Sequence, residues 1–81
     1  MEEWVYEFND NLIQVRNGKV VELLVNGAVQ DNITGVHLKA ELKGVLPSGQ
    51  VIKATLSGLI EVDCTLSVDD VVISPTKTPV R

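Results

Sequence analysis

The chain has 81 residues, enough for one small domain, and a formal net charge of −4 at pH 7. Its seven lysines and arginines are scattered, which argues against binding to nucleic acid or to an anionic membrane surface, since both need a clustered basic footprint. One cysteine and one histidine exclude an internal disulfide and a Cys/His metal cluster, so we expect no cofactor and no metal.

The first predicted strand, Glu3–Phe8, carries all the aromatic residues of the chain on one face. Trp4, Tyr6 and Phe8 occupy alternate positions, the period-two pattern of a half-buried strand. In so small a domain we expect this row to lie in the core. If the strand lies at a sheet edge or on an uncovered face, the row becomes a partner-binding stripe, because aromatic residues supply much of the energy of interfaces.

Turn signals divide the next part of the chain into short strands. Asn9–Asn11 is a polar turn, and Leu12–Arg16 is a predicted strand. Asn17-Gly18 and Asn26-Gly27 each predict a type I′ hairpin turn, because both central residues of that turn need positive φ.

Between these two turns, Lys19–Val25 is apolar on both faces, which predicts a central strand that is covered on both sides. A short return strand, Ala28–Gln30, and a loop over Asp31–Gly35 follow.

The segment Val36–Lys43 fits either a strand or a helix. Read at period two, it places Val36, Leu38, Ala40 and Leu42 inward. Read at period 3.6, it forms a helical stripe with Thr34 as the N-cap. We favour the strand, because the alternation runs into a hairpin turn.

The second half of the chain repeats the pattern of strand and turn. Leu46–Gly49 predicts a type I turn, and Gln50–Leu56 predicts a strand that ends at a Ser57-Gly58 turn. Leu59–Val68 is the most regular alternation in the sequence. We expect its inward residues to be Ile60, Val62, Cys64, Leu66 and Val68.

An Asp69-Asp70 turn and a short strand, Val71–Ile73, complete the predicted elements. Seven or eight short strands at this spacing predict an all-β fold, a small antiparallel β-sandwich or flattened barrel. We expect one domain over residues 1–74 and a flexible C-terminal tail over residues 75–81, which contains Pro75 and Pro79.

Two stretches, Val20–Val29 and Cys64–Ile73, share one hairpin pattern, in which a strand ends in Val-Asn-Gly or Val-Asp-Asp before a short return. This pattern resembles the β-domain of the Fas apoptotic inhibitory molecule family, although Asp70 stands where that family has glycine. The resemblance implies a compact all-β sandwich without enzymatic activity that works through protein contacts. The whole layout is also similar to short bacterial proteins of unknown function.

The chemistry-bearing residues do not form a catalytic signature. We expect His37, without a neighbouring nucleophile or carboxylate in the pattern, to be a solvent-exposed structural residue. Cys64 falls on an inward position, where a thiol acts as a small hydrophobe. The sequence therefore predicts no catalytic residue, no metal ligand and no enzyme.

The sequence favours a non-catalytic protein-interaction or structural module that binds a protein partner or itself as a homo-oligomer. The alternative is a domain for a small carbohydrate or lipid ligand, with Trp4, Tyr6 and Phe8 as a stacking platform. The acidic N-terminus lacks the pattern of a signal peptide, and no apolar run reaches the ~20 residues that span a bilayer, so we expect a cytoplasmic protein.

Overall fold

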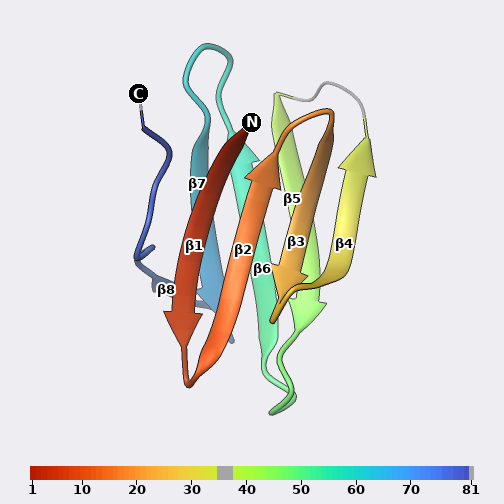
Figure 1. Cartoon of the computed structure of the whole chain (residues 1–81), viewed down its shortest axis with the longest axis vertical. Helices are drawn as coiled ribbons and strands as arrows, with labels where there is room; N and C mark the ends of the chain where they lie inside the picture. The colour runs from red at the N-terminus through yellow and green to blue at the C-terminus, as the bar shows by residue number, and fades with distance from the viewer. Residues whose placement is uncertain (35–37, 81) are drawn as a thin grey trace.

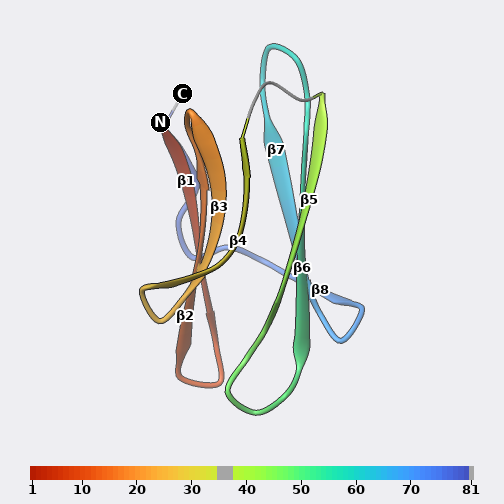
Figure 2. The same ribbon diagram turned by 90° about the vertical axis from the view of Figure 1, so that its right-hand side faces the viewer.

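The chain folds into two antiparallel sheets that pack face to face (Figures 1 and 2). The computed structural model describes residues 1–34 and 38–80, and within them eight strands form two four-stranded sheets that do not close into a barrel. In chain order, the first sheet contains β1 (Glu2–Phe8), β2 (Asn11–Asn17), β3 (Val20–Val25) and β4 (Ala28–Thr34). The second contains β5 (Lys39–Val45), β6 (Val51–Ser57), β7 (Asp63–Val68) and β8 (Val71–Ile73). The predicted all-β antiparallel sandwich is confirmed.

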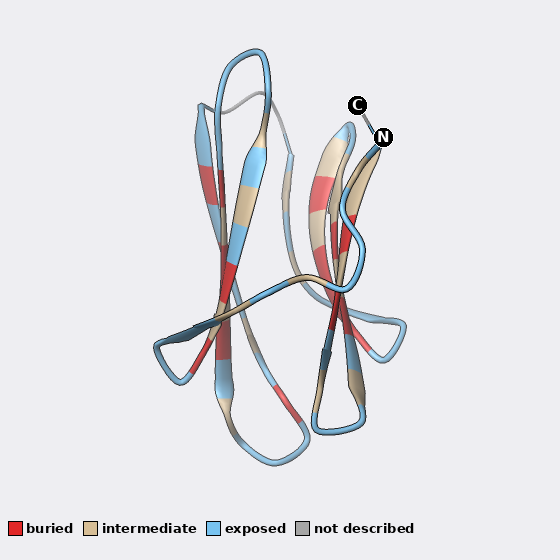
Figure 3. Ribbon diagram, turned by 90° about the vertical axis from the view of Figure 1, so that its left-hand side faces the viewer, coloured by how far each residue is buried: buried red, intermediate tan, exposed pale blue. Residues whose placement is uncertain are grey.

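Alternate residues of both sheets are buried and make one core (Figure 3). Among the described residues, every buried side chain is apolar or aromatic. The largest fully buried side chains are Tyr6, Ile13, Val15, Leu23, Leu42, Leu46, Ile52 and Leu66. The fold is therefore held together mainly by removal of apolar surface from water.

Within residues 1–34 and 38–80, three hairpins use two-residue turns with positive φ at both central residues. The prediction is confirmed at Asn26-Gly27, with φ of 50° and 83°, and the same conformation is found at Asn9-Asp10 and Asp69-Asp70. Leu46–Gly49 also forms its predicted turn, in which the Gly49 N–H donates to the Leu46 carbonyl at 2.8 Å.

The type I′ turn predicted at Asn17-Gly18 is wrong. Neither residue has positive φ, and Asn17 pairs with Val21 across a three-residue connection. A two-residue turn there would set Ile13 opposite Glu22 and point a carboxylate into the core, because pairing partners share one face. The observed register instead pairs Val15 with Leu23, both fully buried.

The return after β3 is longer than predicted. β3 is central in its sheet, as expected, but Val20 and Glu22 on its outer face remain partly exposed, so the prediction that both faces are covered is wrong. Asp31–Thr34, predicted as a loop, belongs to β4, which pairs with β3 with a β-bulge between Leu23 and Leu24.

Side chains of β4 explain this extension, because they accept hydrogen bonds from backbone N–H groups at the edge of β5. The Lys43 N–H donates to Asp31 Oδ2 at 2.9 Å, and the Val45 N–H donates to Gln30 Oε1 at 3.4 Å. Gly44 permits the close approach, because a Cβ there would lie 3.1 Å from the Cβ of Gln30. Polar side chains thus take the place of a neighbouring strand on this edge.

The ambiguous segment is a strand in its described part, so the helical alternative is wrong there. Ala40 and Leu42 on β5 are buried, as the period-two pattern predicts. Leu38, predicted to face inward, precedes the strand and is 68% exposed. The inward prediction for Val36 lies outside the described residues.

The long strand predicted over Leu59–Val68 is wrong in its first part, because β7 begins only at Asp63. A turn at Ser57-Gly58 would set Ala54 opposite Glu61 and Ile52 opposite Asp63, which would again point carboxylates into the core. In the structure Leu56 pairs with Cys64, and residues 58–62 form a loop.

The C-terminal segment crosses from β8 to the edge of β1 (Figure 3). The Val5 N–H donates to the Lys77 carbonyl at 2.9 Å, and the Thr76 N–H donates to the Val5 carbonyl at 2.7 Å. This bridge anchors residues 76 and 77, while mobility of the predicted tail over residues 75–81 stays a prediction.

Two glycine substitutions test the shape of the 58–62 loop. Gly58 has a φ of +132°, and a Cβ there would collide with the Glu61 carbonyl, whereas Gly27 has a φ of +83° and open space around it. We expect Gly58→Ala to lower the free energy of unfolding by about 2 kcal/mol or more, and Gly27→Ala by about 1 kcal/mol. Urea denaturation measures both, and equal losses would contradict the loop geometry.

Candidate interaction surface

The β6–β7 loop places two bulky apolar side chains in solvent. Leu59 is 81% exposed and Ile60 is 95% exposed. The loop extends beyond the neighbouring strands at the end of the sandwich (Figures 1 and 2). Leu38, also exposed, lies beside it, because its carbonyl accepts the Gly58 N–H at 3.2 Å. Leu38, Leu59 and Ile60 are named the apolar tip. A group of exposed apolar side chains of this kind is typical of an interaction site.

The apolar tip was missed by the sequence prediction, which assigned Leu59 and Ile60 to a strand. A signal for it does exist in the sequence. The inward residues of the two flanking strands, such as Leu56 and Cys64, both have even numbers, so an odd number of residues must connect the strands. The two-residue turn Ser57-Gly58 cannot satisfy this condition.

A second feature lies on the outer face of the second sheet, near the other end of β6. The register pairs Lys43 with Lys53 and Lys53 with Ser67. These residues surround a surface hollow of about 390 Å³, which is named the lysine hollow. Its lining residues are Lys43, Val51, Lys53, Ser67, Asp69 and Asp70.

The lining of the lysine hollow holds charges of both signs, with Lys43 and Lys53 on the strands and Asp69 and Asp70 on the β7–β8 turn. Like charges directly opposite one another in a sheet are unfavourable. Lys43 has the Glu41 carboxylate at 3.8 Å, while Lys53 makes no ion pair within the described parts of the chain. Asp69 Oδ1 accepts the Val51 N–H at 3.0 Å, so this carboxylate is fixed within the hollow and keeps its negative charge.

The aromatic row predicted as a possible interaction stripe lies inside the sandwich. Trp4 is 4% exposed, Tyr6 is fully buried, and Phe8 is partly buried against the core. The structure brings the three residues together on the inner face of β1, where they pack as core residues. In the folded chain, Trp4 and Tyr6 present no ring to a partner or ligand.

Tyr6 and Cys64 form a polar contact between the two sheets. The Tyr6 hydroxyl lies 3.4 Å from Cys64 Sγ and 3.5 Å from the Cys64 carbonyl oxygen, so it can donate to either. Burial raises the pKa of the Tyr6 hydroxyl well above its ordinary range. Burial also raises the pKa of the Cys64 thiol, and the hydrogen bond from Tyr6 partly opposes this shift. Because a thiolate is the reactive form, Cys64 is a poor nucleophile and serves packing.

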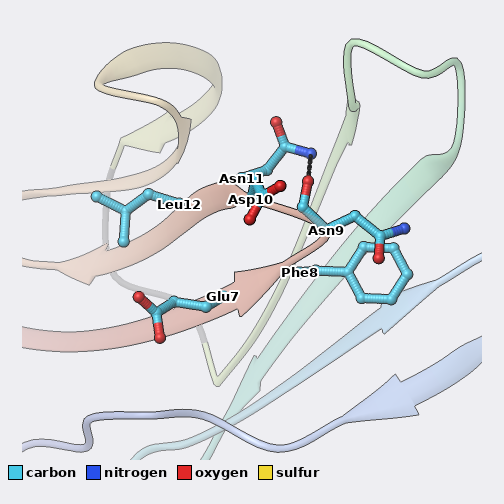
Figure 4. Close-up of a pocket in the computed structure, with 6 residues that line it drawn as sticks. All are labelled: Glu7, Phe8, Asn9, Asp10, Asn11 and Leu12. Carbon is cyan, nitrogen blue, oxygen red and sulfur yellow. Dashed lines mark hydrogen bonds between the residues drawn. The ribbon is translucent and has the colours of Figure 1, made fainter.

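A further hollow, of about 460 Å³, surrounds the turn between β1 and β2 (Figure 4). It is lined by residues 7–12, and the Asn11 side-chain amide donates to the Asn9 carbonyl at 3.1 Å. Its carboxylates belong to Glu7 and Asp10. No group of three or more His, Cys, Asp or Glu residues that could hold a metal ion occurs in residues 1–34 and 38–80. We assign this hollow to the shape of the turn.

The predicted exposure of His37 has no structural test, because this residue lies outside the described residues. Within the described segments, no helix has the length and apolar character needed to cross a membrane.

Comparison with known proteins adds no relative. No protein-family model, curated protein or solved structure matches this chain. The resemblance to the Fas apoptotic inhibitory molecule family therefore stays a prediction.

The Tyr6–Cys64 contact predicts loss of stability at alkaline pH. Both groups keep their protons more tightly in the folded chain, so unfolding becomes easier once the unfolded thiol ionises, above a pH of about 8.5, and the unfolded phenol follows near 10. Between pH 7 and 10.5 we expect the free energy of unfolding to fall for the unmodified chain. For the double variant Tyr6→Phe/Cys64→Ala we expect a fall that is smaller by at least about 1 kcal/mol. Urea denaturation across this range measures the loss, and parallel pH curves would contradict it.

Proposed function

We propose that this chain is a non-catalytic protein-interaction module that acts in the cytoplasm and binds through its apolar tip. The observation that carries the proposal is the exposure of adjacent Leu59 and Ile60, at 81% and 95%. Burying one such side chain contributes about 1.5–3 kcal/mol. Insertion of both into a recess of another protein gives the tip a favourable binding energy.

The attachment of the apolar tip to the β6–β7 hairpin supports this role. The loop connects β6 and β7, whose register continues without interruption from Ile52↔Val68 to Ser57↔Asp63. A loop at the end of such a hairpin is held in place by a rigid scaffold, which lowers the entropy lost on binding. The Gly58 N–H bond to the Leu38 carbonyl adds a second attachment.

The alternative of a carbohydrate or lipid ligand on the aromatic row receives no support from these positions. A stacking platform needs an open ring face, and Trp4 and Tyr6 are both buried. The proposed partner is therefore a protein chain, either a different protein or a further copy of this one.

Site-specific photocrosslinking tests the proposal. A photoreactive benzophenone side chain replaces Ile60 in the full chain. This chain is expressed in cells of its source organism, and the cells are irradiated. The matched control carries the same group in place of Val80, another apolar side chain that is 99% exposed. We expect a discrete protein adduct at position 60 and none at position 80, measured by mass spectrometry. Equal yields at both positions, or no adduct at either, would contradict the role of the apolar tip.

A further inference from the structure

The chain contains two Asn-Gly pairs, Asn17-Gly18 and Asn26-Gly27, and the structure holds their asparagine side chains in different ways. Asparagine loses its side-chain amide most readily when glycine follows it, because glycine has no Cβ to obstruct its own backbone nitrogen. We propose that Asn17 is a site of spontaneous deamidation in the folded chain, while Asn26 is protected from the same reaction.

The reaction uses only water and base. The Gly18 backbone nitrogen loses its proton to hydroxide and attacks Asn17 Cγ. A bond from this nitrogen to Cγ forms, the bond from Cγ to Nδ2 breaks, and Nδ2 takes a proton from water and leaves as ammonia. Water then opens the resulting succinimide ring at either carbonyl, which leaves aspartate or isoaspartate at position 17. The asparagine Cγ must therefore be able to rotate toward the nitrogen of the following glycine.

The Asn26 side chain is fixed by hydrogen bonds from both ends of its amide. Its Oδ1 accepts the Leu12 N–H at 2.9 Å, and its Nδ2 donates to Asn11 Oδ1 at 3.0 Å. Its backbone N–H also donates to the Leu12 carbonyl at 2.8 Å. Rotation of Asn26 Cγ toward the Gly27 nitrogen would break both side-chain bonds and leave the Leu12 N–H without this acceptor.

The Asn17 side chain is held less firmly. Its Nδ2 donates to Glu2 Oε1 at 3.1 Å, and this is the one hydrogen bond of the side chain among the described residues. Asn17 forms the last pair of both ladders to which it belongs, opposite Glu2 and opposite Val21, and ladder ends open at the lowest free energy. The Gly18 N–H makes only a long bond, of 3.3 Å, to the Val20 carbonyl. Because Gly18 and Gly27 are both exposed, the restraint on the asparagine side chain separates the two sites.

Modification changes the charge where the β1–β2 ladder ends. Asn17 lies directly opposite Glu2, and the amide nitrogen that donates to the Glu2 carboxylate is replaced by a carboxylate oxygen. Like charges on directly opposed residues are unfavourable. The isoaspartyl product also inserts one further carbon into the backbone of β2. Both products therefore loosen the end of the first sheet.

Mass spectrometry of peptides from the aged full chain tests the proposal. The folded chain is incubated at mildly alkaline pH, the exchange of the amide for a carboxylate is read from the mass, and electron-transfer dissociation separates aspartate from isoaspartate. Because more hydrogen bonds hold Asn26, we expect Asn17 to react at least about tenfold faster than Asn26. In guanidinium chloride we expect similar rates at the two sites, since the reacting dipeptide is the same.

Gly18→Ala is the matched variant for the attacking nitrogen. The added Cβ would lie 3.5 Å from Met1 Cγ, an ordinary contact, and Gly18 does not have positive φ, so the fold accepts it. We expect this variant to react at least about tenfold more slowly at position 17 and at an unchanged rate at Asn26. Equal rates at the two sites of the folded chain, faster reaction at Asn26, or an unchanged rate at position 17 in Gly18→Ala would each overturn the proposal.

Discussion

The structure depends on one constraint of strand pairing: residues that face each other across two antiparallel strands must share the same side of the sheet. In this sandwich that side is an apolar core, to which both sheets contribute. Val15 therefore lies opposite Leu23, and Leu56 lies opposite Cys64. Any shift by one residue would exchange a whole apolar face for a polar one.

This constraint sets the length of each hairpin connection. Two-residue turns join strands whose inward residues have opposite parity, as Tyr6 and Ile13 do across Asn9-Asp10. Strands whose inward residues have the same parity need an odd number of connecting residues. The β6–β7 connection belongs to the second kind, and its five residues carry Leu59 and Ile60 out of the sheet. The exposure of these two side chains is thus a direct consequence of the register that pairs the core residues of β6 and β7.

The sequence alone was sufficient for the fold class and for most strands. Alternation placed Trp4 and Tyr6 on an inward face, and Asn26-Gly27 marked a true type I′ turn. It failed where a local turn signal conflicted with the register, because a signal such as Asn17-Gly18 contains no information about the facing strand. It also failed at Asp31, whose carboxylate accepts a backbone N–H from a strand of the other sheet.

The candidate site was harder to predict than the fold for a related reason. The lysine hollow combines Lys43, Lys53 and Ser67 from three strands, and their neighbourhood exists only once the strand order and register are known. The apolar tip was hidden because Leu59 and Ile60 continue an alternation that is real only from Asp63 onward. The sequence distinguishes the loop part of this alternation from the strand part once one asks whether the inward residues of the two flanking strands have odd or even numbers.

Amide hydrogen exchange measured by NMR tests the central claim most directly, because it reports which residues of 59–68 belong to the sheet. The structure predicts that the Leu59 and Ile60 amides exchange at close to the unprotected rate, while the Leu66 amide, inside β7 and paired with β6 and β8, is strongly protected. Continuous protection from Leu59 through Val68 would show one long strand and would contradict the exposed tip.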